Sequence, residues 1–303
     1  MSHHHNHSHS HLHAHSDANK NIAVAFFLNL LFCIIELIGG LYTGSIAILS
    51  DALHDFGDSI ALGLAWIFQK ISEKKPTARY TYGYKRFSLL SAIINSVVLI
   101  TGSIFVLYES IQRIASPVET NAKGMLLLAV LGVIVNGAAI LRLKKGSSIN
   151  ERVVSLHLLE DVLGWIAILI ASIVMLFVNV PVLDPILSVV ISIFILYNVY
   201  RNMRSIFPVI LQGKPDAIDE KEIREKLMIL PGIKDIHDLH IWTMDSEYNI
   251  LTVHLVLKEK KGIEEQQGIR AQARSLLKEN DIQHATIEIE YESESCEWCE
   301  NET

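Results

Sequence analysis

The sequence predicts an all-α transmembrane domain of six helices followed by a small cytoplasmic α+β domain. Half of the 303 residues are apolar, and the charged residues are sparse before about residue 210 and dense after it. The first part contains apolar stretches long enough to span a membrane, whereas the second alternates between helix-like and strand-like patterns. These observations favour a membrane part joined to a soluble part.

Six stretches satisfy the requirement of about 20 mostly apolar residues for a spanning helix. They cover residues 22–42, 46–68, 87–111, 122–142, 151–178 and 183–206. The links after the first and fifth stretches ("YTGS" and "NVPVLD") are very short, so these neighbours are expected to form tight antiparallel hairpins.

Lysine and arginine predict the orientation, because cytoplasmic loops carry an excess of both. Two links on one side hold ten such residues: Lys70, Lys74, Lys75, Arg79, Lys85, Arg86, Arg142, Lys144, Lys145 and Arg152. The opposite side holds only Arg113 and Lys123. Both termini are therefore expected in the cytoplasm, and the short loops favour a bacterial inner membrane, with lipid around the bundle.

The C-terminal part reads as helix, strand, strand, helix, strand, in the α-β-β-α-β order. Residues 217–229 form the first amphipathic helix, "IKDIHDLHIWTM" and "YNILTVHLVL" the strands, "GIEEQQGIRAQARSLLKEN" the second helix, and "HATIEIEYE" the last strand. The predicted domains are a disordered histidine-rich tail (1–20), the membrane domain (21–210), the α+β domain (211–292) and a disordered tail (293–303). The N-terminal tail carries eight of the fourteen histidines and is expected to bind metal weakly.

Charge and cysteine content exclude two classes of function. A formal net charge of −7, with no basic stripe interleaved with aromatic residues, argues against nucleic-acid binding. Three cysteines are too few for a disulfide framework. Cys33 fits a helix core, whereas Cys296 and Cys299 form a Cys-x-x-Cys that is half a zinc site. Tail histidines or His240, from the same chain or a partner subunit, could complete it.

Two histidine–aspartate pairs stand out within the predicted spans. His54 and Asp58 are four residues apart in the second span, and His157 and Asp161 have the same spacing in the fifth. On a helix this spacing places both side chains on one face. Charged groups are costly inside a membrane, so two matched pairs indicate function. Two imidazole nitrogens and two carboxylate oxygens predict a tetrahedral zinc site. Imidazole is a poor ligand for Mg²⁺ and Ca²⁺.

These pairs, the six spans and several motifs resemble the cation diffusion facilitator family, in particular zinc transporters of the cobalt–zinc–cadmium resistance type. The matching motifs are "SDALHDFGDS", "YTYGYKRF", "LDPILS", "ILQGKP", "HDLHIW" and "HATIEIE". The resemblance covers essentially the whole chain and implies a metallochaperone-like cytoplasmic domain. It implies a homodimeric secondary transporter that exports Zn²⁺, with Cd²⁺ and Co²⁺ as further substrates, in exchange for protons by alternating access.

The resemblance also implies a regulatory zinc site in the cytoplasmic domain, at His237, His240, His254 and Glu290, with His284 in the same region. Two other classes remain open from the residues alone. A membrane zinc enzyme would keep an open coordination position for water, and a metal sensor would bind zinc without moving it. The absence of a His-Glu-x-x-His motif counts against the enzyme.

Overall fold

The computed structural model describes residues 27, 29–143, 149–178 and 180–292, and for residues 139, 142, 143 and 149–158 the backbone only. The chain divides into two compact units. The helical unit comprises Met1–Gln69 and Leu90–Arg201, and the α+β unit comprises Lys70–Leu89 and Asn202–Thr303.

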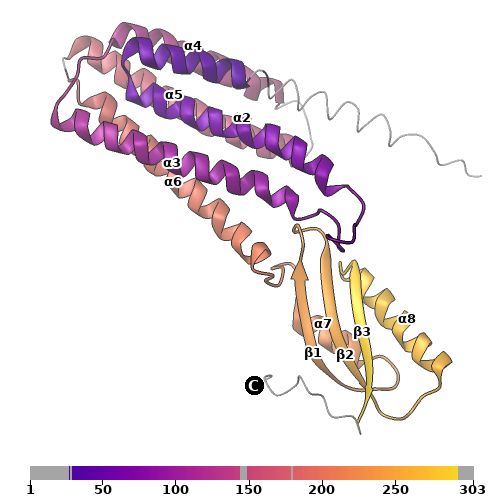
Figure 1. Ribbon diagram of the computed structural model, residues 1–303. Coiled ribbons are helices and arrows are strands. Elements are labelled where there is room, and N and C mark those ends of the chain that lie inside the picture. Colours follow the sequence, from indigo (N-terminus) through magenta and orange to yellow (C-terminus); the bar gives the residue numbers. More distant parts are fainter. Residues whose placement is uncertain (1–26, 28, 144–148, 179, 293–303) are drawn as a thin grey trace, which may run out of the picture. The chain divides into compact units, whose positions relative to one another are not determined.

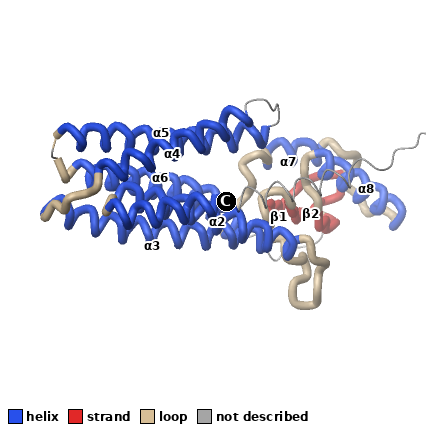
Figure 2. Tube along the Cα trace, turned by 90° about the horizontal axis from the view of Figure 1, so that it is seen from above, coloured by secondary structure: helices blue, strands red, loops and turns tan. Residues whose placement is uncertain are grey.

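The helical unit is built from long helices that run side by side (Figures 1 and 2). A helix over Asn29–Thr43 precedes the five labelled ones. Their bounds are α2 Ile46–Ser72, α3 Phe87–Ala115, α4 Ala122–Leu143, α5 Ile149–Phe177 and α6 Leu183–Ile210. The last turns of α6 and the start of α3 belong to the α+β unit.

The interior of the helical unit is small and its exterior is strongly apolar. One buried cluster joins α2, α4 and α5 through Ala47, Ile48, Met125, Ala129, Trp165 and Ile168. Large apolar side chains such as Phe105, Leu127 and Phe177 are mostly exposed. An apolar exterior of this extent is typical of helices that face lipid. Helices are suited to this environment because all their backbone hydrogen bonds are made within the helix.

Three helices of the described residues are long and apolar enough to cross a membrane: Phe87–Ala115, Leu159–Phe177 and Leu183–Ile210. Asn29–Thr43 and Ala122–Ala138 are apolar but shorter. The 27-residue α2 carries Asp51, His54, Asp55 and Asp58, which lower its hydropathy. A transmembrane helical unit is thus supported, whereas the number of six spans remains a prediction.

The α+β unit has the predicted element order. It consists of α7 (Glu220–Met228), β1 (Ile233–Thr243), β2 (Asn249–Leu257), α8 (Ile263–Glu279) and β3 (His284–Tyr291). The three-stranded sheet has the order β1-β2-β3, in which β1 and β2 are antiparallel and β2 and β3 are parallel. The parallel pair requires a crossover, and α8 provides it.

One face of this sheet is covered by α7 and α8 (Figure 1). Its core is formed by alternate strand residues, including Leu251, Val253 and Leu255, with Leu227 of α7 and Leu277 of α8. Because successive side chains of a strand point to opposite faces, the residues between these positions lie on the other face. That open face carries the histidines and carboxylates considered next.

Candidate metal-binding sites

The first candidate site lies in the helical unit between α2 and α5. His54 Nε2 is 3.8 Å from Asp58 Oδ2 on its own helix and 3.9 Å from Asp161 Oδ1 on α5. The three side chains are 11–23% exposed. One imidazole nitrogen is thus placed between two carboxylates from different helices.

These distances suit a shared metal ion better than direct hydrogen bonds. A tetrahedral zinc ion with ligands at about 2.0–2.2 Å separates its donor atoms by about 3.4 Å. The nitrogen–oxygen separations here are slightly longer than that and exceed normal hydrogen-bond lengths. A small movement of α2 toward α5 would bring His54 Nε2 and Asp161 Oδ1 to ligand spacing, whereas the separation of His54 and Asp58, both on α2, changes by side-chain rotation. The side chain of His157, the fourth predicted ligand, lies outside the described residues.

Further carboxylates surround this site on the buried side of α2. Asp51 and Asp55 are each 6% exposed, and Glu36 on the preceding helix is 1% exposed. The Asn29 side chain donates to the Asp55 carbonyl oxygen at 3.0 Å and to Ser59 at 3.1 Å. These contacts join the first helix to α2 beside the metal-site residues, so the polar surroundings extend beyond the His-x-x-x-Asp pairs.

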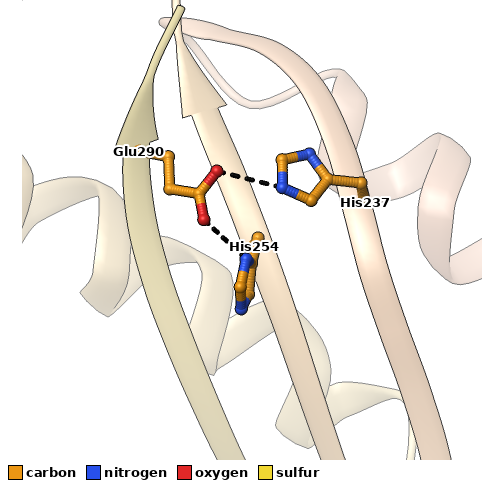
Figure 3. A group of neighbouring side chains, drawn as sticks. All are labelled: His237, His254 and Glu290. Atoms are coloured by element: carbon orange, nitrogen blue, oxygen red, sulfur yellow. Dashed lines mark ion pairs between the residues drawn. The ribbon is translucent and has the colours of Figure 1, made fainter. Parts of the chain in front are cut away.

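The second candidate site lies on the open face of the sheet in the α+β unit (Figure 3). Glu290 of β3 makes ion pairs with His237 of β1, at 3.0 Å, and with His254 of β2, at 2.6 Å. His237 and His254 face each other across β1 and β2, because they are paired in the strand register. One ligand atom from each residue lies within 4.8 Å of the other two. Two imidazole nitrogens and one carboxylate oxygen form a donor set that fits Zn²⁺.

Two more carboxylates hold the other side of the His254 ring. Its Nε2 is 3.4 Å from Asp238 and 3.5 Å from Glu288. Metal-bound histidines usually donate their second ring N–H to a carboxylate, which fixes the ring orientation. His254 therefore presents Nδ1 toward His237 and Glu290, while its Nε2 contacts the supporting carboxylates.

A bulge in β1 brings Asp238 to this position. The register shifts between His237 and His240, and Asp238 has a φ of +50°. A bulge re-aims the side chain of the extra residue. His240, 63% exposed, contacts Asp238 at 2.8 Å, so it reaches the site only through that carboxylate.

Of the other predicted ligands, His284 is not part of this group. His284 begins β3, and its ring packs against that of Tyr82 at a centroid distance of 5.4 Å, within the α+β unit. Cys296 and Cys299 lie outside the described residues. Sequence reasoning did not assign Asp238 and Glu288. Glu288 could have been found from its alternation with Glu290 along β3, whereas the bulge that turns Asp238 has no clear sequence signal.

The fold and these two sites together define a multi-helix membrane protein with histidine–carboxylate clusters in both of its units. Family comparison identifies the class further. Residues 22–211 match the cation efflux transmembrane domain, and residues 215–292 match the cytoplasmic domain of cation efflux proteins. The chain belongs to the cation diffusion facilitator family, whose members are metal-cation efflux transporters and not enzymes.

Individual relatives match along nearly their whole length. A cadmium, cobalt and zinc/H(+)-K(+) antiporter of Bacillus velezensis is 37% identical, covering 89% of this chain and 88% of the relative. The zinc transporter ZitB of Pectobacterium atrosepticum is 33% identical over 90% and 86% of the two chains. The metal cation efflux system protein CzcD of Cupriavidus metallidurans is 32% identical over 89% and 86%.

Proposed function

We propose that the protein exports Zn²⁺ from the cytoplasm in exchange for protons, by alternating access at His54, Asp58, His157 and Asp161. The position of His54 Nε2 between Asp58 of α2 and Asp161 of α5 supports this proposal most directly. Ligands from two helices allow one ion to be held when the helices approach and to be released when they separate.

The chemistry of these ligands explains how zinc and protons would compete. Zinc requires neutral imidazole and ionised carboxylates, so binding releases protons and protonation releases metal. Two aspartates also neutralise the ion's charge, which limits the cost of holding it within the membrane. Proton entry would thus drive metal exit through the same four side chains.

Zinc is the proposed main substrate because the site combines nitrogen and oxygen donors. The names of the relatives cited above include zinc, cadmium and cobalt. Cd²⁺ and Co²⁺ accept similar ligands, so we propose both as secondary substrates. One relative's name also includes K⁺ as a counter-ion, which a flux experiment distinguishes from protons.

The site at His237, His254 and Glu290 is proposed to sense cytoplasmic zinc. Its residues come from all three strands, so a bound ion would tie the strands together at one point. We propose that this stabilises a homodimer and biases the membrane unit toward transport when zinc is abundant. Both termini face the cytoplasm in this proposal, in agreement with the distribution of lysine and arginine.

Zinc flux into proteoliposomes with a defined pH gradient tests the proposal. The purified protein should accumulate Zn²⁺ when the lumen is acidic, with matching proton release from the lumen and no need for K⁺. Asp161→Asn removes one charged ligand and should abolish the flux. Glu160→Gln, an exposed neighbour on α5, is the matched control and should transport normally.

Two results would contradict the proposal. Normal flux by the Asp161→Asn protein would show that Asp161 is not a ligand in transport. Zinc flux that does not depend on the pH gradient but requires K⁺ would show that protons are not the counter-ion.

A further inference from the structure

The first turn of α2 is capped by a carboxylate from another helix. Asp184, near the start of α6, accepts three hydrogen bonds: from Ser45 Oγ at 2.5 Å, from the Ile46 N–H at 2.8 Å and from the Ala47 N–H at 3.3 Å. Ser45 Oγ accepts from the Ile48 N–H at 3.2 Å. The first N–H groups of any helix have no partner within that helix. In α2, those of Ile46 and Ala47 donate to Asp184, which lies at least 137 positions away in the sequence.

This cap is completely buried. Asp184, Ser45 and Ala47 have no exposed area, and Ile46 is 1% exposed. Water cannot replace the carboxylate at such a position, so removing it would leave the N–H groups of Ile46 and Ala47 without acceptors. A negative charge at a helix N-terminus is also favoured by the helix dipole.

The same face of α6 holds α2 at two further points. Ser188 and Ser192 follow Asp184 at intervals of four residues, which places all three on one side of the helix. Ser188 Oγ donates to the Ile46 carbonyl oxygen at 3.4 Å, and Ser192 Oγ lies 3.3 Å from Ser50 Oγ. Serines allow close approach of membrane helices and hydrogen-bond between them.

The turn before α2 is fixed as well. Gly44 has a φ of +68°, which reverses the chain after the first helix. The Arg113 guanidinium donates to the Gly44 carbonyl oxygen at 2.6 Å, and the Asn121 N–H donates to the Thr43 carbonyl oxygen at 2.8 Å. The start of α2 is thus held from both sides, by α3 and its following loop and by α6.

We propose that Asp184 is a positioning residue for the membrane metal site, because it caps the N-terminus of α2 from α6, together with Ser45 at the N-cap position. No proline interrupts α2, so fixing its first turn sets the height of every later residue. At about 1.5 Å per residue, His54 and Asp58 lie about 12 and 18 Å along the axis from Ile46. This inference rests on the proposed function, in which His54 and Asp58 bind the transported ion.

The alternative roles of Asp184 are metal ligand and proton carrier. Both need the carboxylate charge, whereas a cap needs only a side-chain oxygen that accepts from the backbone. Asparagine is as good an N-cap as aspartate. In Asp184→Asn, the single amide oxygen can accept from the Ile46 N–H or from the Ala47 N–H, and the amide nitrogen cannot replace the second acceptor. Asparagine therefore keeps part of the cap, whereas alanine keeps none.

The test compares the full chain with its Asp184→Asn, Asp184→Ala and Ser45→Ala variants in two measurements. The first is zinc affinity of the membrane site, in a His237→Ala and His254→Ala background. The second is the distance between spin labels at residues 67 on α2 and 200 on α6, with Cys296 and Cys299 replaced by serine. Ile67 and Tyr200 are exposed in the structure, so labels at these positions should be tolerated.

We expect Asp184→Asn, which keeps one of the two backbone acceptors, to weaken zinc binding by only about threefold and to broaden the label distance less than Asp184→Ala does. Asp184→Ala should weaken zinc binding about tenfold or more and broaden the distance, because the cap is lost. If that variant does not fold, Ser45→Ala supplies the test, with a smaller loss of affinity and an intermediate broadening.

The proposal is overturned if folded Asp184→Asn is as impaired as Asp184→Ala, since the charge would then be what matters. It is also overturned if Asp184→Ala or Ser45→Ala keeps both the zinc affinity and the label distance of the parent chain. The label distance does not depend on transport. If the parent chain moves no zinc but the variants show these changes in label distance, the proposed function is refuted and the positioning role of Asp184 is retained.

Discussion

Replacing Glu290 by glutamine should test whether Glu290 binds the metal of the α+β unit directly or only lies beside the residues that do. Glu290 uses both carboxylate oxygens, at 3.0 and 2.6 Å from two histidines, and its side chain is only 13% exposed. Glutamine keeps the shape and removes the charge that a zinc ion requires. Glu288→Gln is a matched control: the residue lies on the same strand, but its side chain is 64% exposed and contacts His254 from the other side.

The expected magnitudes differ clearly. Losing a supporting partner of a metal ligand already costs about 10–100-fold in affinity, so losing the ligand itself should cost about 100-fold or more. A 100-fold loss corresponds to about 2.7 kcal/mol. Glu288 contacts the same His254 nitrogen as Asp238, so Asp238 can keep the ring oriented when Glu288 is replaced. The exposed Glu288 contact should then contribute only about 0–1 kcal/mol, which limits the effect of its substitution to about fivefold.

The assay is a competition titration of the full-length protein with a fluorescent zinc chelator, in an Asp161→Asn background that disables the membrane site. The dissociation constant should rise about 100-fold or more for Glu290→Gln and by at most about fivefold for Glu288→Gln. Equal effects of the two substitutions, or no effect of Glu290→Gln, would refute the assignment of Glu290 as a ligand.

Two further predictions concern stability. Leu255 has no exposed area in the core of the sheet unit, and Leu255→Ala should cost about 2.7–5 kcal/mol because it leaves a cavity. Chemical unfolding of the full chain followed by circular dichroism checks this, and a loss below about 1 kcal/mol would contradict it. In the helical unit, a Cβ at Gly132 would lie 2.1 Å from the Trp165 ring, whereas one at Gly137 meets nothing within 4 Å. Gly132→Ala should therefore lower the melting temperature in detergent and Gly137→Ala should not; the reverse order would disprove this packing of α4 on α5.

The α+β unit was largely predictable from the sequence. Alternation such as that of Leu251, Val253 and Leu255 predicts both the strand and its buried face. The same alternation places His254 and Glu290 on the opposite face. The contact of Asp238 with His254 was not predictable, because it depends on a bulge and a positive φ that the local sequence does not require.

In the helical unit, the candidate ligands could be predicted from the sequence, whereas the residues that position them could not. The repeated His-x-x-x-Asp spacing indicated that His54, Asp58 and Asp161 meet, and the structure brings these three together. Asp184 could be noticed in its "LDPILS" motif but not interpreted. Its role follows from which helix N-terminus it reaches across the bundle, and tertiary packing alone determines that.

The central claim is that residues of α2 and α5 together bind one zinc ion, and that protons displace this ion. The most direct measurement is zinc stoichiometry at a series of pH values, with X-ray absorption at the zinc edge. The protein used has its α+β site removed by His237→Ala and His254→Ala, lacks residues 1–20, and carries serine in place of Cys296 and Cys299, so that these other predicted zinc ligands do not contribute. The account predicts one ion per chain at neutral pH, with nitrogen and oxygen ligands at about 2.0–2.2 Å. It also predicts loss of the ion on acidification and its absence in Asp161→Asn. Zinc that stays bound in acid, or that binds equally well without Asp161, would contradict it.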